Sequence, residues 1–217
     1  MSNYLLYVII ISALIYLINI IRFIISLNKK YSPLLNKKQI PISVIIAVKN
    51  GEKNITRLLD ALLIQKYNGD MEFIIVDDNS TDNTKNIIDS YVHNDSRVKY
   101  ISSNTGDELL DHKKRALDAG IQSSQYEYLL FTDVDCIIQS FWVESMASCF
   151  AGDFNYIIGL TYINKGEYII NKFQRTDLFM LLSASYASVV LGSPWASSGQ
   201  NQAYTKSLYN KIGGFKK

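Results

Sequence analysis

The sequence predicts an α/β domain with a mainly parallel sheet, preceded by one transmembrane helix. Two observations lead to this prediction. Apolar runs of strand length alternate with segments of helical periodicity through most of the chain, as in βαβ units. Residues 4–21 form an apolar segment interrupted only by Ser12 and Asn19, close to the length that an α-helix needs to cross a bilayer. We therefore divide the chain into a membrane anchor (1–27), a basic linker (28–40) and a folded domain (41–217).

The N-terminal segment carries charge at one end only. Arg22 closes it, where a long side chain can reach the headgroups, and no Lys or Arg precedes it. A buried core helix is the alternative, but the segment is apolar all round rather than along one stripe. By the positive-inside rule, the lysines that follow predict a single-pass protein of the plasma (inner) membrane with its main domain in the cytoplasm. These lysines are Lys29, Lys30, Lys37 and Lys38.

Composition excludes several classes of function. The 217 residues carry a formal net charge of +2, without the basic face expected of a nucleic-acid-binding protein. The two cysteines, Cys136 and Cys149, form neither a CxxC motif nor a Cys/His cluster, so we expect reduced thiols rather than a disulfide or a zinc site.

The elements of the domain follow from its hydrophobic pattern. Residues 41–48 are a continuous apolar run rich in β-branched residues, typical of a strand buried on both faces, and Asn50 is expected to cap a helix over 52–67. The long apolar helix near the C-terminus is expected to be packed or interfacial rather than a second span. The remaining elements are strands at 71–78, 97–102, 126–135 and 154–163, and helices at 85–92, 111–124, 139–150 and 172–191.

Polar residues gather where the predicted strands end. Ligands of open parallel sheets bind at the carboxyl ends of the strands. Asp133-Val134-Asp135 follows a buried strand and offers two hard oxygen donors, as Mg²⁺ or Mn²⁺ beside a phosphate requires. The alternative is an ordinary acidic loop.

Two further groups have a similar placement. Asp77-Asp78 ends another strand and can accept hydrogen bonds from a nucleoside base or a ribose, although the same residues also suit the turn before the next helix. Lys113 and Lys114 could place a positive charge near a diphosphate, or could simply form a solvated helix face.

Five ordered motifs resemble those of family-two glycosyltransferases with the GT-A fold, the Rossmann-like fold of nucleotide-diphospho-sugar transferases. They span about residues 41–215, and they read PISVIIAVKNGEKNI, FIIVDDNSTDNT, HKKRALDAGI, YLLFTDVD and SSGQNQAYTKSLYNKIGGF. The resemblance implies transfer of a sugar from a UDP- or GDP-sugar to a lipid-linked or glycan acceptor at the membrane, with inversion.

The resemblance also implies roles for particular residues. Asp133 and Asp135 would form the metal-binding DxD. On the donor side it implies Asn50, Asp77 or Asp78, Lys113 and Asp133, and on the acceptor side Trp195, Gly199, Gln200 and Asn201.

The chain departs from the family pattern at three places. Gly51 stands where a Glu is usual, and His112 stands where a Gly is common before Lys113. The family places an acidic pair that supplies the general base shortly after the GGF segment, whereas no carboxylate follows Asp177 here. We therefore expect a C-terminally truncated chain that binds donor but transfers sugar poorly.

Other classes remain open. A non-catalytic nucleotide-sugar-binding remnant would keep the fold without the activity, and a nucleotidyltransferase shares the sheet and the acidic metal site. A phospho-acceptor receiver domain would need its acidic pair after the first strand, where Lys49-Asn50-Gly51 stands. A dehydrogenase would need a GxGxxG motif after a strand.

Overall fold

The computed structural model describes residues 2–29, 39–152, 154–163, 166 and 168–216, and the expected basic residues Lys30, Lys37 and Lys38 lie outside this range. The chain forms two compact units, which we describe separately. The two-helix unit comprises residues 1–32 and 160–197, and the sheet unit comprises residues 33–159 and 198–217.

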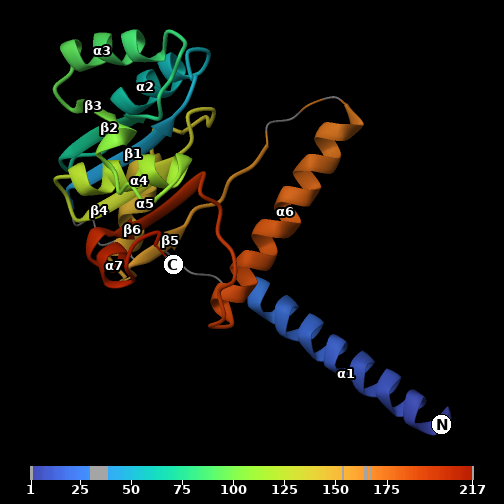
Figure 1. Ribbon diagram of the computed structural model, residues 1–217. Helices are drawn as coiled ribbons and strands as arrows, with labels where there is room; N and C mark the ends of the chain where they lie inside the picture. Colours follow the sequence, from blue (N-terminus) through green and yellow to red (C-terminus); the bar gives the residue numbers. More distant parts are fainter. Residues whose placement is uncertain (1, 30–38, 153, 164–165, 167, 217) are drawn as a thin grey trace. The chain divides into compact units, whose positions relative to one another are not determined.

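The sheet unit is built on one six-stranded sheet with the order β3-β2-β1-β4-β6-β5 (Figure 1). Strands β1 to β4 pair in parallel, while β6 runs antiparallel to both of its neighbours. This mixed α/β architecture confirms the predicted fold class. The strands are β1 (Ile42–Val48), β2 (Met71–Asp77), β3 (Val98–Ser102), β4 (Tyr128–Thr132), β5 (Tyr156–Ile158) and β6 (Asn201–Thr205).

Helices cover both faces of the sheet. Alternate residues of β1 enter different cores, since Val44 and Ile46 belong to one apolar cluster and Ile45 to the other. Burial on both faces explains why the strand is an unbroken apolar run. One face carries α2 (Ile55–Leu63), α3 (Thr84–Asn94) and α5 (Trp142–Phe150), and the other carries α4 (His112–Ser123) and α7 (Lys206–Lys211), with a short 3₁₀ helix η1 (Ser103–Thr105) after β3.

Some local expectations were wrong. Asn50 does not cap α2, which begins at Ile55 after Asn54. Asn50 instead has a positive φ of 53°, and its side-chain oxygen accepts a hydrogen bond from the backbone N–H of Thr81 at 2.8 Å. The strand expected over 126–135 is also shorter, because β4 ends at Thr132 and the chain then turns.

A buried carboxylate joins three strands near their amino ends. Glu72 of β2 is 2% exposed and accepts hydrogen bonds from Ser43 Oγ of β1 at 2.5 Å and from Lys99 Nζ of β3 at 2.6 Å. The backbone N–H of Gln125, just before β4, adds a third at 2.7 Å. Burial raises the pKa of the Glu72 carboxyl, but the hydrogen bonds from Lys99, Ser43 and Gln125 outweigh it and bring the pKa below the ordinary value.

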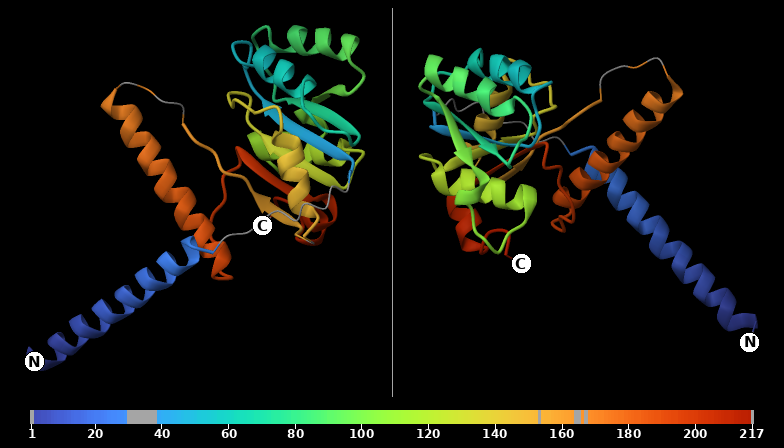
Figure 2. Two further views of the ribbon diagram at one scale, coloured as in Figure 1. Left: turned by 180° about the vertical axis from the view of Figure 1, so that it is seen from behind. Right: turned by 45° about the horizontal axis from the view of Figure 1, so that its top comes forward.

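The two-helix unit contains α1 (Ser2–Leu27) and α6 (Ile169–Val190). Among the described residues, α1 is the one helix whose length and hydropathy suit a membrane span, over Tyr4–Leu27. Figure 2 shows the C-terminal ends of the two helices side by side. Ser26 is buried there, and the Tyr186 hydroxyl donates a hydrogen bond to the carbonyl oxygen of Lys29.

Candidate functional site

A pocket of about 490 Å³, which we call the carboxyl-end pocket, lies where β1 and β4 end. Five residues expected at a donor site line it together, although they come from four separate segments of the chain. These residues lie close together because parallel strands place their carboxyl ends along one edge of the sheet. The lining residues are Ala47, Val48, Lys49, Asn50, Gly51, Asn54, Asp78, His112, Lys113, Asp133, Val134 and Asp135.

The acidic end of this pocket is formed by the turn after β4. Asp133 is half-buried and Asp135 is exposed, and the backbone N–H of Cys136 closes the turn on the carbonyl oxygen of Asp133 at 3.1 Å. Lys113 Nζ, from the first turn of α4, lies 2.5 Å from Asp133 Oδ1. This end of the pocket therefore holds the two carboxylates of Asp133 and Asp135 and the ammonium group of Lys113, with Asp133 already paired.

Arg57 of α2 supports the same turn from outside the pocket. Its Nη2 donates to the carbonyl oxygen of Asp135 at 3.0 Å. Just after α2, the Gln65 side chain donates from Nε2 to the Gln139 carbonyl at 2.8 Å and accepts the Val143 N–H on Oε1 at 3.0 Å, so it binds the segment that follows the Asp135 turn. Sequence reasoning missed both residues, because nothing local in the sequence marks contacts made across more than 70 residues.

The loops after β1 and β2 are joined by hydrogen bonds. The N–H of Asn50 donates to Ser80 Oγ at 2.9 Å, and the N–H of Gly51 donates to Thr84 Oγ1 at 2.8 Å. Glu52, one residue after the position where the family has Glu, accepts the N–H of Asn83 at 3.0 Å. A Cβ at Gly51 would lie 2.4 Å from Val48 Cγ2, so the loop packs too closely there for a larger residue.

The two members of the Asp77-Asp78 pair occupy different environments. Asp77 is 6% exposed and accepts hydrogen bonds from the Ser80 N–H at 3.1 Å and the Tyr100 hydroxyl at 3.2 Å, so it organises the turn. Asp78 lines the carboxyl-end pocket, with Lys49 Nζ at 3.9 Å from its Oδ2. Of the pair, only Asp78 contributes to the lining.

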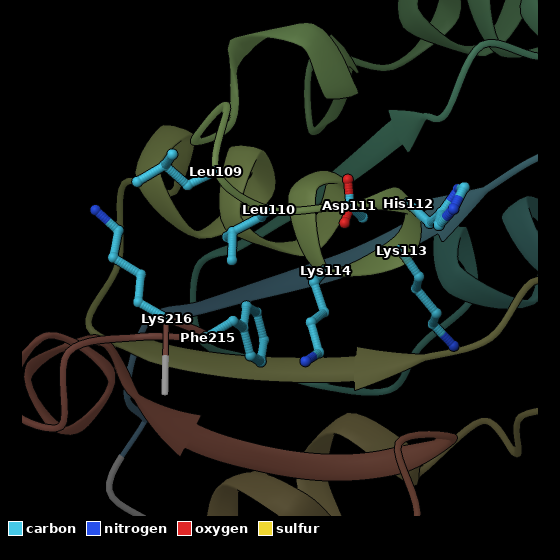
Figure 3. Close-up of a pocket in the computed structure, with 8 residues that line it drawn as sticks. All are labelled: Leu109, Leu110, Asp111, His112, Lys113, Lys114, Phe215 and Lys216. Carbon is cyan, nitrogen blue, oxygen red and sulfur yellow. The ribbon is translucent and has the colours of Figure 1, made fainter.

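The two lysines at the start of α4, Lys113 and Lys114, also differ in the pockets that they line. Lys113 lines both the carboxyl-end pocket and a neighbouring pocket of about 510 Å³ that includes Phe215 and Lys216, whereas Lys114 lines the neighbouring pocket but not the carboxyl-end pocket. Figure 3 shows Lys114 beside Phe215, with Lys113 and His112 at the opposite end of that group.

The residues expected on the acceptor side divide between the two units. Gly199 and Gln200 are exposed just before β6, and Asn201 pairs with Thr132, the residue preceding Asp133. Trp142 Nε1 donates to Asn201 Oδ1 at 2.9 Å, so this amide oxygen is already bound. Trp195 is 65% exposed and belongs to the two-helix unit.

The donor set fits a metal that is shared with a phosphate ligand. The described residues contain no group of three or more His, Cys, Asp or Glu side chains placed to hold a metal ion. Asp133 and Asp135 are two carboxylates, and Mg²⁺-type ions commonly bind proteins through one or two carboxylates while phosphates and waters complete the coordination.

Comparison with known sequences identifies relatives with this arrangement. The sequence model described as glycosyl transferase family 2 matches residues 43–213. The chain is 28% identical over 193 residues to poly-beta-1,6-N-acetyl-D-glucosamine synthase of Staphylococcus aureus, covering 87% of this chain and 45% of that protein. It is 31% identical over 105 residues to glycosyltransferase GlyG of Streptococcus pneumoniae, covering 48% and 33% respectively. The chain thus spans less than half the length of these relatives.

Solved structures share the fold. The mannosyltransferase PcManGT from Pyrobaculum calidifontis, in complex with GDP-Man and Mn²⁺, superposes with a TM-score of 0.69 at 18% identity, covering 92% of this chain and 54% of that one. Glucosyl-3-phosphoglycerate synthase from Mycobacterium tuberculosis, in complex with Mn²⁺, UDP and glucosyl-3-phosphoglycerate, superposes with a TM-score of 0.56 at 19% identity, covering 79% and 59%. Both likenesses agree with the predicted GT-A fold.

Proposed function

Because the chain belongs to glycosyl transferase family 2, we propose that it forms the donor-binding part of a membrane-anchored enzyme that transfers a sugar from a nucleoside-diphosphate donor. The observation that supports this proposal best is the meeting of Asp78, Lys113, Asp133 and Asp135 in one pocket. A diphosphate needs cationic partners, and two carboxylates beside a lysine can supply them when a divalent ion binds.

Each residue has a separate role in the proposed site. Asp133 and Asp135 hold Mg²⁺ or Mn²⁺, which neutralises the diphosphate leaving group when bound. Lys113 adds a second positive charge to that group. Asn50 and Asp78 lie at the end of β1 and β2 and bind the nucleoside, while Asp77 holds the turn that positions Asp78.

The acceptor binds on the side of β6. Gly199, Gln200 and Asn201 form the acceptor rim on the sheet unit. Trp195, which belongs to the other unit, is the aromatic residue that we assign to an acceptor sugar ring. An acceptor hydroxyl attacks the anomeric carbon, with inversion, as the nucleoside diphosphate leaves. We assign no residue of the described pocket as the base that removes the hydroxyl proton.

The donor class and the location follow from separate observations. The solved neighbours carry GDP-Man or UDP, which supports a GDP- or UDP-sugar as the donor. The length and hydropathy of α1 support a membrane anchor, and the lysines that follow it in the sequence support a cytoplasmic sheet unit at the plasma (inner) membrane. This location suits a lipid-linked or glycan acceptor, and no nucleic-acid partner is proposed.

Titration of the full chain with UDP and GDP in the presence of Mn²⁺ tests the proposal. We expect saturable binding of one nucleotide, lost in Asp135→Asn and retained in Asp89→Asn, an exposed carboxylate of α3 paired with Lys85. No binding of either nucleotide to the wild-type chain would refute the donor site. Binding without transfer would favour a non-catalytic remnant, and release of pyrophosphate from a substrate would favour a nucleotidyltransferase.

A further inference from the structure

His112 begins α4 in a backbone conformation that glycine adopts more easily. Its φ is 46°, in the left-handed region, where a Cβ crowds the backbone. Among the described residues, the other non-glycine residues with positive φ are Asn50 and Asn79, whose short amides suit this region better. A residue held in this conformation at a pocket is a candidate for a functional role.

The imidazole of His112 is placed to meet a ligand. It lines the carboxyl-end pocket together with Lys113 and Asp133. Figure 3 shows the ring pointing away from Phe215 and Lys216. His112 is exposed, and within the described part of the chain its ring has no hydrogen-bond partner. A glycine here would relieve the backbone but would leave this part of the pocket wall without a donor.

We propose that His112 is a specificity-determining residue that donates a hydrogen bond from its imidazole N–H to the diphosphate of the donor, an inference that rests on the proposed function. The residue is adjacent to Lys113, whose ammonium lies 2.5 Å from Asp133 Oδ1, at the end of the pocket where the metal-bound diphosphate is expected. Asp78 and Asn50 serve the nucleoside end. The ring therefore distinguishes a nucleoside diphosphate from a nucleoside.

Three variants of the full chain separate the ring from the backbone conformation. His112→Gly removes both, His112→Ala removes the ring but keeps a Cβ at positive φ, and Asn79→Gly is the matched control. Asn79 has a φ of 57° but does not line the carboxyl-end pocket. The measurements are the unfolding temperature and the dissociation constant of UDP or GDP with Mn²⁺, whichever the wild-type chain binds.

The proposal predicts opposite changes in stability and affinity for His112→Gly. The unfolding temperature should rise by about 2–4 °C, while nucleoside-diphosphate binding weakens about tenfold, as expected for loss of a hydrogen bond to a charged group. His112→Ala should weaken binding equally without the thermal gain, and Asn79→Gly should gain stability with unchanged binding. If His112→Gly binds the nucleoside diphosphate as tightly as the wild type, the role of His112 is overturned and the proposed function still stands. If the wild-type chain binds no nucleoside diphosphate, both the role of His112 and the proposed function are overturned.

Discussion

Glu72→Gln tests the buried carboxylate that joins β1, β2 and β3. Ser43 Oγ and the Gln125 N–H both bind Oε1, so an amide oxygen in that position can keep both hydrogen bonds. Lys99 Nζ binds Oε2 at 2.6 Å and would then face an NH₂ group. The variant therefore loses one charge-assisted hydrogen bond at a carboxylate that is 2% exposed. Such a bond contributes about 1.5–3 kcal/mol, and the lower half applies because Lys99 can turn to solvent.

The assay is thermal unfolding of the full chain followed by circular dichroism. A loss of about 1.5–2 kcal/mol should lower the unfolding temperature by about 3–8 °C at pH 7. The pKa of Glu72 in the folded state is below its ordinary value of 4.5, so the stabilisation is present above that value and is lost as the pH falls through the folded pKa. The difference between wild type and variant should therefore shrink below about pH 4.5.

Two results would refute this reasoning. Equal unfolding temperatures at pH 7 would mean that the charged pair contributes nothing net, as happens when desolvation cancels the attraction. A difference that persists unchanged at pH 3 would mean that the charge of Glu72 is not its source. Asp89→Asn, which breaks the exposed pair with Lys85, is the control and should change the unfolding temperature little.

Two other substitutions test contacts around the site. Arg57→Met keeps the aliphatic stem but removes the donor to the Asp135 carbonyl. The affinity for Mn²⁺, measured by electron paramagnetic resonance, should therefore fall about 3–10-fold. An unchanged affinity would show that the turn after β4 holds its shape without Arg57. Tyr209→Phe removes the hydroxyl that donates a hydrogen bond to buried Asp118 at 2.9 Å. Urea titration should show that the free energy of unfolding falls by about 1–2 kcal/mol, while nucleotide binding is preserved. A matching loss of nucleotide binding would contradict a purely stabilising role for Tyr209.

The parallel half of the sheet could be predicted because its signal is local. Residues 42–48 and 71–77 are buried on both faces, so both strands are mostly apolar, with Ser43, Glu72 and Asp77 as their polar residues, and the sequence shows this pattern directly. Strand β6 was not predicted, because Asn201–Thr205 is short and half polar. Its pairing depends on β4, which lies about 70 residues earlier, and hydrophobic pattern carries no information on such a partner.

For the candidate site, too, the sequence could predict only what has a local signal. The motif residues Asn50, Asp78, Lys113, Asp133 and Asp135 line one pocket, as expected from strand ends that share an edge, although their roles remain predictions. Sequence alone could not separate Asp77 from Asp78 or Lys113 from Lys114. Which member of each pair lines the pocket depends on the orientation of the backbone at the strand end and at the first turn of the helix.

The pairing of β5 with β6 has a consequence for how the chain can vary. These antiparallel neighbours resemble the two arms of a β-hairpin whose turn has been replaced by residues 160–197. The arms close on each other, since the Gly159 N–H donates to the Asn201 carbonyl at 2.8 Å, and a Cβ at Gly159 would meet the Asn201 side chain at 2.4 Å. Because the ends of the inserted segment are fixed by the sheet itself, its length and sequence can change at little cost to the strands. The β5–β6 pair is thus an insertion point at which different segments could be exchanged while the carboxyl-end pocket stays the same.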